Sequence, residues 1–257
     1  MPNKDCKNLT QNLNNIKWQK GGKMGLKKII RNIKISIQKL SQNRKRGFDH
    51  IISLGYNCEV AYSFLKYFYF EESGLFNWAY SKNIDDLINA LKDTDNIGKN
   101  GFVFVVSGLW ECQKTFVQFH GKEDNTKNGA AEVTSRLNYL KNKFVKIAQS
   151  DDKKLYIYKM KTSQIDQKTP KKLEMLWNAL AKNVGAKNFQ LLVVCEQNAK
   201  PIKSSDKYIT RTVKFFAPDT DVTNGSYMRN GWDDIFYEFY PKKIGKKPTK
   251  KYKFDKK

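Results

Sequence analysis

One cysteine of the chain lies where a nucleophile would be held. The segment Ser53-Leu54-Gly55-Tyr56-Asn57-Cys58 joins a short apolar run to a helical pattern. Gly55 allows a sharp turn because it has no Cβ, and Cys58 then falls at or near the first turn of the helix. Free amide groups and the helix dipole stabilise a thiolate at such a place. The alternative interpretation is a small buried apolar residue without chemistry. The other cysteines are Cys6, Cys112 and Cys195.

A nucleophilic cysteine needs a base, and the chain has two histidines. His120 follows a predicted strand over 115–119 and precedes Gly121, so we expect it in a loop at the carboxyl end of that strand. Ligands bind at the carboxyl ends of strands in open α/β sheets. His50 lies about 13 Å from that end of its own strand, which indicates a strand-start or core histidine. The predicted pair is Cys58 and His120, and the alternative for His120 is an ordinary surface-loop histidine.

A third group would orient the imidazole, and the sequence does not choose between the candidates. They are Asn77, Asp124 and Asn125, with the later acids Asp219, Asp221 and Asp233 as further alternatives. Other chemistries lack their patterns: there is no C-x-x-C pair, no H-E-x-x-H and no G-x-G-x-x-G. We therefore expect neither a bound metal nor a cofactor.

The elements that would position these residues alternate along the chain. Apolar runs predict strands over 51–54, 102–106, 115–119, 155–158, 189–195 and 208–216. Helical spacing predicts helices over 58–68, 83–91, 170–182 and 231–239, with Asn83 as a helix cap. A long helix is marked by Val133, Leu137, Leu140, Phe144 and Ile147. This alternation is typical of a three-layer α/β fold with a mostly parallel or mixed sheet.

The charge of the chain divides it into three parts. The net charge is +23, yet residues 1–47 hold 13 Lys and Arg against one acid, and residues 241–257 hold 9 Lys against one acid. We predict a basic leader over 1–47, one α/β domain over 48–240 and a Lys-rich, disordered tail over 241–257. Within the leader, apolar residues recur every three or four positions over 26–40, which indicates a basic amphipathic helix.

Basic ends suggest an anionic partner. Solvated tails, an anionic membrane surface and nucleic acid are the alternatives, in that order, because Lys outnumbers Arg 42 to 6 and Arg is the preferred fork for phosphate. The first 23 residues are polar and no apolar run is long enough to span a bilayer. We expect no signal peptide, reduced thiols and a cytoplasmic protein, with peripheral attachment to the inner face of the membrane as an alternative to solvated tails.

Two motifs resemble those of a known family. The segment over 52–61, I-S-L-G-Y-N-C-E-V-A, and the segment over 73–78, S-G-L-F-N-W, followed by Ser81, are similar to the motifs of a bacterial family classified as papain-like cysteine peptidases. The resemblance covers about 48–240 and is densest over 48–92. It implies Cys58 as nucleophile, a histidine-bearing loop at His120, and roles for Trp78 and for Arg136 on the following helix. Asn77 stands where the family usually has Asp, and Gly231-Trp232 resembles the closing segment.

Three functions follow as hypotheses. The first is a cysteine peptidase or related thiol hydrolase or acyl transferase with a Cys58–His120 pair, acting on a peptide, acyl or glycan-linked substrate. The second is a transferase or accessory protein of surface-polysaccharide biosynthesis, since the family's members resemble components of such gene sets. In that case Arg136 or a nearby Lys would hold the phosphate of an activated sugar. The third is a non-enzymatic binding module tethered to an anionic surface.

Overall fold

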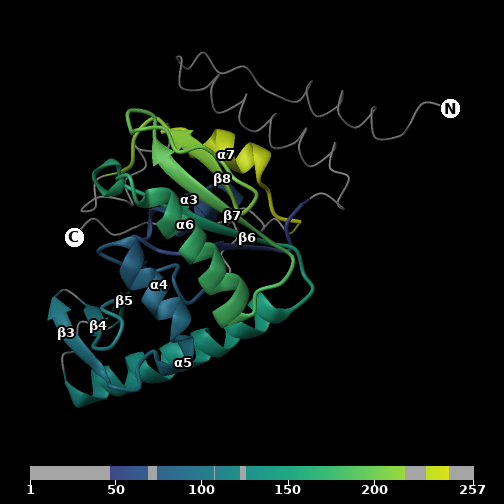
Figure 1. Cartoon of the computed structure of the whole chain (residues 1–257). Coiled ribbons are helices and arrows are strands. Elements are labelled where there is room, and N and C mark those ends of the chain that lie inside the picture. The colour runs from purple at the N-terminus through teal and green to yellow at the C-terminus, as the bar shows by residue number, and fades with distance from the viewer. Residues whose placement is uncertain (1–46, 69–73, 107, 122–125, 218–229, 243–257) are drawn as a thin grey trace, which may run out of the picture. The chain divides into compact units, whose positions relative to one another are not determined.

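The structure is a computed structural model that describes residues 47–68, 74–106, 108–121, 126–217 and 230–242. All of these residues belong to one structural unit. The expected leader, the amphipathic helix over 26–40 and the Lys-rich tail beyond Lys242 lie outside the described residues. Figure 1 shows the described elements with their labels.

Four strands of the described chain form a parallel sheet in the order β1-β6-β7-β8. They are β1 (His50–Ser53), β6 (Lys154–Lys159), β7 (Phe189–Glu196) and β8 (Tyr208–Val213). All neighbouring strands in this sheet run parallel. Every residue of β6 is buried, as expected for a strand that is covered on both faces. The carboxyl ends of the four strands therefore lie along one edge, and their amino ends along the other.

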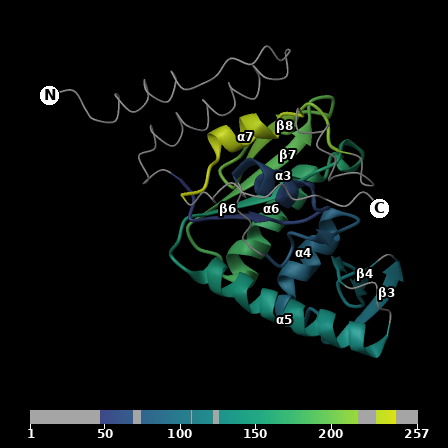
Figure 2. The ribbon, with the colours of Figure 1, turned by 180° about the vertical axis from the view of Figure 1, so that it is seen from behind.

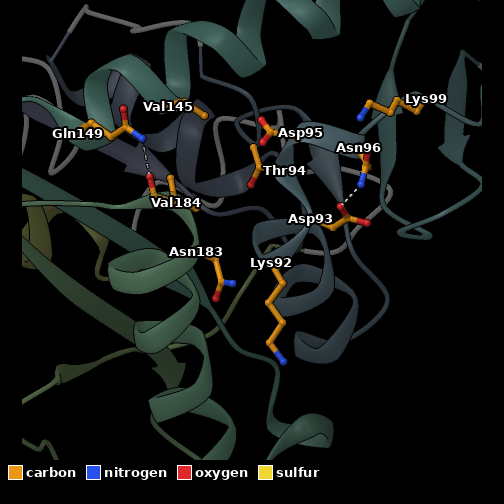
Figure 3. A pocket seen from close by; sticks show the side chains of 10 residues that line it. All are labelled: Lys92, Asp93, Thr94, Asp95, Asn96, Lys99, Val145, Gln149, Asn183 and Val184. Atoms are coloured by element: carbon orange, nitrogen blue, oxygen red, sulfur yellow. Dashed lines mark hydrogen bonds between the residues drawn. The ribbon is translucent and has the colours of Figure 1, made fainter.

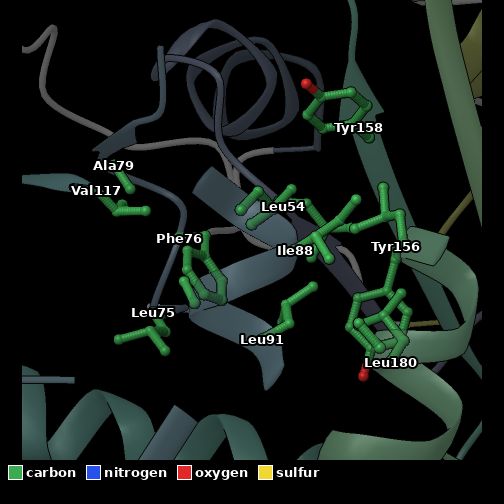
Figure 4. Close-up of a cluster of buried hydrophobic side chains, with 14 of the residues drawn as sticks. Leu54, Leu75, Phe76, Ala79, Ile88, Leu91, Val117, Tyr156, Tyr158 and Leu180 are labelled. Atoms are coloured by element: carbon green, nitrogen blue, oxygen red, sulfur yellow. The ribbon is translucent and has the colours of Figure 1, made fainter. Parts of the chain in front are cut away.

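Helices cover both faces of this sheet (Figures 1 and 2). On one face, alternate residues of β6 and β7 join a core with α4 (Ile84–Lys92), α5 (Lys127–Gln149) and α6 (Thr169–Asn178). The last of these helices continues as a π-helical segment, η3 (Ala179–Val184). Figure 4 shows side chains from the sheet, from α4 and from η3 converging there, among them Tyr156, Tyr158, Ile88, Leu91 and Leu180.

The other face of the sheet packs against α3 (Glu59–Phe68) and α7 (Trp232–Glu238). Aromatic side chains join these two helices: the ring of Phe236 lies 5.7 Å from that of Phe64 and 5.6 Å from that of Phe68, in edge-to-face geometry. Two short 3₁₀ turns, η1 (Thr94–Asn96) and η2 (Thr162–Gln164), follow α4 and β6.

A second sheet of four antiparallel strands lies beside the first, in the order β2-β5-β4-β3. Its strands are β2 (Ala79–Tyr80), β3 (Phe102–Val106), β4 (Leu109–Cys112) and β5 (Gln118–His120). Its buried side chains belong to the same core and meet α5 closely. At Gly121 an added Cβ would come within 2.4 Å of Val133 and 2.7 Å of Trp110. Only glycine fits there without movement of the helix or the sheet.

The sequence pattern predicts the parallel sheet but not the antiparallel one. The α/β class is confirmed, as are a strand over Phe102–Val106 and the cap at Asn83, whose side chain accepts a hydrogen bond from the Asp86 amide. The strand predicted over 115–119 instead begins at Gln118 and ends at His120, and β4 is not predicted at all. Short amphipathic strands such as these depend on partners that are distant in the sequence.

Within the described part of the chain, no helix combines the length and the apolar character needed to cross a membrane.

Candidate active site

The turn that carries Cys58 begins where β1 ends. Gly55 and Tyr56 both adopt left-handed backbone conformations, with φ of 85° and 69°, and the Gly55 amide donates to the Ser53 hydroxyl at 3.2 Å. Two successive residues of this kind reverse the chain sharply. The Cys58 carbonyl accepts the first helical hydrogen bond, from the Tyr62 amide at 2.9 Å. Cys58 therefore occupies the cap position immediately before α3, close to the place predicted from the sequence.

The two neighbours of Cys58 in the chain are held by one buried ammonium group. Lys159 Nζ, at the end of β6, donates to Glu59 Oε2 at 2.6 Å and to Asn57 Oδ1 at 3.2 Å. Asn57 Oδ1 also accepts from the Glu59 amide at 3.1 Å. Asn57 and Glu59 are buried, whereas Cys58 between them is partly exposed. This alternation directs the flanking side chains toward the sheet and leaves the thiol accessible.

The Glu59 carboxylate is a junction of three segments. Its Oε1 accepts from the Ala217 amide at 3.2 Å, from Asn230 Nδ2 at 3.0 Å and from Trp232 Nε1 at 2.9 Å. The side chains of Lys159 and Glu59 are 0% and 2% exposed. The ammonium also lies 4.5 Å from the centre of the Phe216 ring, a favourable position for a cation. Both buried charges are therefore compensated, as charges removed from water must be.

Other polar groups line the same edge of the parallel sheet. Glu196, the last residue of β7, accepts from the Thr162 hydroxyl at 2.8 Å and from the Phe216 amide at 3.0 Å. Because the strands are parallel, this carboxylate shares the carboxyl edge with Lys159 and with the turn after β1. Ligands of α/β proteins bind at this edge, so the structure places Cys58 where the sequence predicts it.

His120 lies elsewhere than predicted. It is the last residue of β5 in the antiparallel sheet, not a loop residue at the carboxyl edge of the sheet that carries Cys58. Its amide donates to the Trp78 carbonyl at 3.1 Å, and its side chain is exposed. Partial burial of the ring, with the nearby positive charge of Arg136, lowers the pKa of His120 below its ordinary value. The neutral imidazole is therefore the main form at pH 7.

The antiparallel sheet is joined to the Cys58 turn through β2. The Ser81 amide donates to the Tyr56 carbonyl at 3.3 Å, and the rings of Tyr56 and Tyr80 lie 5.7 Å apart. β2 pairs directly with β5, which ends at His120. The structure has no hydrogen bond between the Cys58 thiol and the His120 ring, so their pairing in catalysis stays a prediction.

The remaining residues named in the sequence analysis lie at several places, some of them outside the described residues. Asn77 is buried and Trp78 half-buried in the turn before β2, and Arg136 lies on α5 near His120. Asp233 lies in the first turn of α7. The others lie outside the described residues: Asp124, Asn125, Asp219, Asp221 and Cys6. His50 begins β1 as predicted, with Nε2 3.1 Å from Asp152 Oδ2.

Two further cysteines of the described chain are buried and free of disulfide bonds. Burial, together with the negative charge of Glu196, raises the pKa of the Cys195 thiol to about 12. At Cys112 burial acts in the same direction, but hydrogen bonds led by that of Thr115 bring the pKa below its ordinary value. Both side chains are nevertheless inaccessible, whereas Cys58 is not. The described residues contain no group of three or more His, Cys, Asp and Glu side chains suited to a metal ion.

Sequence reasoning missed the Glu59–Lys159 pair. The two residues are 100 positions apart, and nothing local links them. One signal was present: Lys159 stands within the run Leu-Tyr-Ile-Tyr-Lys-Met, in which the apolar residues on both sides predict burial of the lysine. A buried lysine requires an acceptor, and Glu59, next to the predicted nucleophile, was an available one.

A polar cavity of about 320 Å³ lies away from this site (Figure 3). Its lining includes Gln149 at the end of α5, Val184 at the end of η3 and Lys92 at the end of α4. The first two immediately precede the segments that lead into β6 and β7, so the cavity lies toward the amino edge of the parallel sheet. Cys58 lies at the carboxyl edge, and the cavity is no part of its surroundings.

Comparison of the chain with protein-family models, with curated proteins and with solved structures finds no match. The resemblance to papain-like cysteine peptidases therefore rests on the two motifs alone.

Proposed function

We propose that the protein is a thiol hydrolase or acyl transferase in which Cys58 is the nucleophile and His120 the base, and that its nearest activity is that of a papain-like cysteine peptidase. One observation carries the proposal: a partly exposed thiol caps a helix at the carboxyl edge of a parallel sheet, and both of its neighbours in the chain are fixed by a buried ammonium. Accessibility and fixed geometry are what a nucleophile requires.

The proposed reaction has two steps. Cys58 Sγ attacks the carbonyl carbon of the substrate while the thiol proton passes to the neutral His120 ring. The bond to the leaving group then breaks, and that group takes the proton from His120. Water or an acceptor then attacks the carbonyl carbon of the resulting thioester and gives a proton to His120. The C–S bond breaks, the acyl product leaves, and His120 returns the proton to Cys58 Sγ. Amide groups of the first turn of α3 would stabilise the negative charge that develops on the oxygen.

The electrostatics of His120 support its role as base. A base must be unprotonated at the working pH, and the lowered pKa of His120 favours that form. The ring is carried by the sheet whose β2 strand contacts the Cys58 turn. The absence of a hydrogen bond between the thiol and the ring is compatible with this role, since catalytic hydrogen bonds are often long or poorly aligned until the substrate is bound.

Alkylation of the folded full chain with iodoacetamide tests the nucleophile. At pH 6.5 we expect the Cys58 peptide to be modified faster than those of Cys112 and Cys195. His120→Ala should slow this reaction, because the base is lost. His50→Ala is the matched control, since His50 is the only other histidine and lies at the amino edge. Equal slowing by both substitutions, or none by His120→Ala, would contradict the Cys58–His120 pair.

An activated acetyl ester separates a catalyst from a merely reactive thiol. The wild-type chain should accumulate acetyl on Cys58 and then release it to water with turnover, while Cys58→Ser should show neither event. Acetylation without release would indicate an acyl transferase that lacks its acceptor. If no acetyl forms on Cys58, the glycan-directed transferase and the binding module become the better hypotheses, and binding of nucleotide sugars would separate those two.

We also propose that the basic ends place the protein at the cytoplasmic face of a membrane. Each Lys or Arg near an anionic surface contributes about 1 kcal/mol, which weakens as salt is added. The full chain should therefore sediment with vesicles that contain phosphatidylserine and not with phosphatidylcholine vesicles. Removal of residues 241–257, which hold nine lysines, should reduce that binding. Equal binding to both vesicles, or to neither, would leave the basic ends as solvated tails.

A further inference from the structure

Backbone pairing between β1 and β6 ends just before the turn that carries Cys58. The last bond of the ladder runs from the Leu54 amide to the Ile157 carbonyl at 2.9 Å. β1 is an edge strand, so β6 is its only partner within the described sheet. Beyond Leu54 the chain leaves the sheet through Gly55 and Tyr56. Beyond that point the backbone of this segment is bonded to β2, through the Ser81 amide and the Tyr56 carbonyl, and to α3, through the Tyr62 amide and the Cys58 carbonyl, but no longer to β6 by the ladder.

Beyond the last bond of that ladder, the Lys159 side chain links β6 to the segment that carries Cys58. Lys159 lies two residues beyond Ile157 on β6, and its ammonium binds the residue before Cys58 and the residue after it. We propose that Glu59 and Lys159 form a positioning pair for the Cys58 thiol, fixing the peptide segment that carries it at the carboxyl edge of the sheet. This inference rests on the proposed role of Cys58 as nucleophile.

The chemistry of the pair fits positioning better than it fits stability alone. Replacing a buried ion pair by apolar side chains of similar volume is often neutral or stabilising. Directional bonds from four donors to the carboxylate, and from the ammonium to both Asn57 and Glu59, instead fix the rotation as well as the place of the segment. The same carboxylate ties the turn to the start of α7 through Asn230 and Trp232, and to the segment after β8 through Ala217. The residues on either side of Cys58 are thereby linked to β6, and Glu59 also to α7.

A second lysine pair in the same unit provides a matched comparison. Lys172 Nζ lies 2.7 Å from Asp85 Oδ2, nearly the separation found in the Glu59–Lys159 pair. It joins α6 to α4 and contacts no residue next to Cys58. Its side chains are 29% and 49% exposed. A substitution there removes a charge pair of similar geometry without touching the segment that carries the thiol.

The deciding variant removes both charges at once. In Glu59→Gln/Lys159→Met the amide still accepts hydrogen bonds, and no unpaired charge stays buried. The measurement is the iodoacetamide alkylation rate of Cys58 against pH in the full chain, with the modified peptide identified by mass spectrometry and folding checked by thermal unfolding. We expect a folded protein in which the Cys58 rate at pH 7 falls at least about tenfold and the pH profile moves to higher pH. Lys172→Met should leave both unchanged.

A folded double variant with the wild-type rate and pH profile would overturn the proposal and leave the pair a role in folding only. If the double variant does not fold, Asn57→Ala decides. That substitution removes one of the two bonds that flank Cys58 and leaves both charges paired. A slower Cys58 then supports positioning, and an unchanged Cys58 refutes it. A different result would contradict the proposed function itself: Cys58 of the folded wild-type chain reacting no faster than the thiols of the urea-unfolded chain.

Discussion

The two ends of strand β6 each carry a fully buried lysine, and the two are satisfied in different ways. Lys154 and Lys159 are both 0% exposed. At the amino edge, Lys154 Nζ donates to the Ser150 carbonyl at 2.6 Å and to the Asp152 carbonyl at 2.7 Å. At the carboxyl edge, Lys159 is bound by the Glu59 carboxylate at 2.6 Å. One lysine has neutral partners, and the other has a charged partner.

The difference lies in what the two ammonium groups connect. Lys154 caps the carbonyl end of α5, where a cation is favoured by the helix dipole, and the two hydrogen bonds of its ammonium go to the segment that leads into its own strand. Lys159 links the turn before α3 and, through Glu59, the start of α7. The fully buried ion pair thus lies at the edge that carries the candidate nucleophile. The amino edge has helix capping by Lys154 and more exposed ion pairs, His50 with Asp152 and Lys242 with Asp49.

The largest effect that this comparison predicts is that of Glu59→Ala. It leaves the Lys159 ammonium buried without a counter-charge and removes the acceptor of three further donors. Breaking a buried pair in this way costs about 3–5 kcal/mol in the free energy of unfolding. Lys172→Met, which breaks an exposed pair, should cost about 0–1 kcal/mol. Urea denaturation of both variants measures the difference. Equal losses in the free energy of unfolding would show that the buried Glu59–Lys159 pair matters no more to stability than the exposed Lys172–Asp85 pair.

Lys154→Met should have a smaller effect than Glu59→Ala. The substitution removes two hydrogen bonds to carbonyl groups, each worth on the order of 1 kcal/mol, but it also removes a charge that is costly to bury. We expect a loss of about 1–2 kcal/mol in the free energy of unfolding, measured by the same denaturation. The Cys58 alkylation rate should stay at its wild-type value, because Lys154 lies at the opposite edge. A loss larger than that of Glu59→Ala would reverse the comparison.

Much of the framework that positions the site follows from the sequence. Helical periodicity identifies the buried face of α5, where Val133, Leu137 and Phe144 are 4%, 3% and 2% exposed. The strand–turn–helix at Cys58 follows from an apolar run, a glycine and a helical pattern, which are all local signals. Local signals suffice for these elements because the spacing of the apolar side chains within each one already defines the face that it buries.

The rest depends on contacts between distant segments. β2 has only two residues and β5 three, too few for a periodic signal, and they become strands only by pairing with each other and with β4. His120 was therefore assigned to the wrong sheet. The Glu59–Lys159 pair forms across 100 positions, and a single sequence gives no sign of which acid meets which base. His120 ends β5 of the antiparallel sheet and Cys58 follows β1 of the parallel sheet, and their pairing in catalysis stays a prediction.

The smallest effect in the comparison is a difference in pH dependence at the amino edge. Burial lowers the pKa of Lys154 below that of an ordinary lysine, although the charges of Asp152, Asp151 and Asp49 act to raise it. Between the lowered pKa of the folded state and the value of about 10.4 in the unfolded chain, the unfolded state binds more protons. The free energy of unfolding contributed by Lys154 therefore rises with pH across that window.

Lys154→Met abolishes this contribution, and that gives the test. Urea denaturation of the wild type and the variant, run in steps from pH 7.5 to about 10.4, should show the wild type gaining stability relative to Lys154→Met as the pH rises. The reason is that the buried ammonium loses its proton and with it the cost of being charged. Lys172→Met is the control: the hydrogen bond with Asp85 raises the pKa of Lys172, so its contribution to stability should stay constant over this range and fall only above the ordinary lysine value. If the free energy of unfolding of the wild type relative to Lys154→Met instead falls as the pH rises, the folded state favours the charged form of Lys154. Both edges of the sheet would then stabilise a charged lysine.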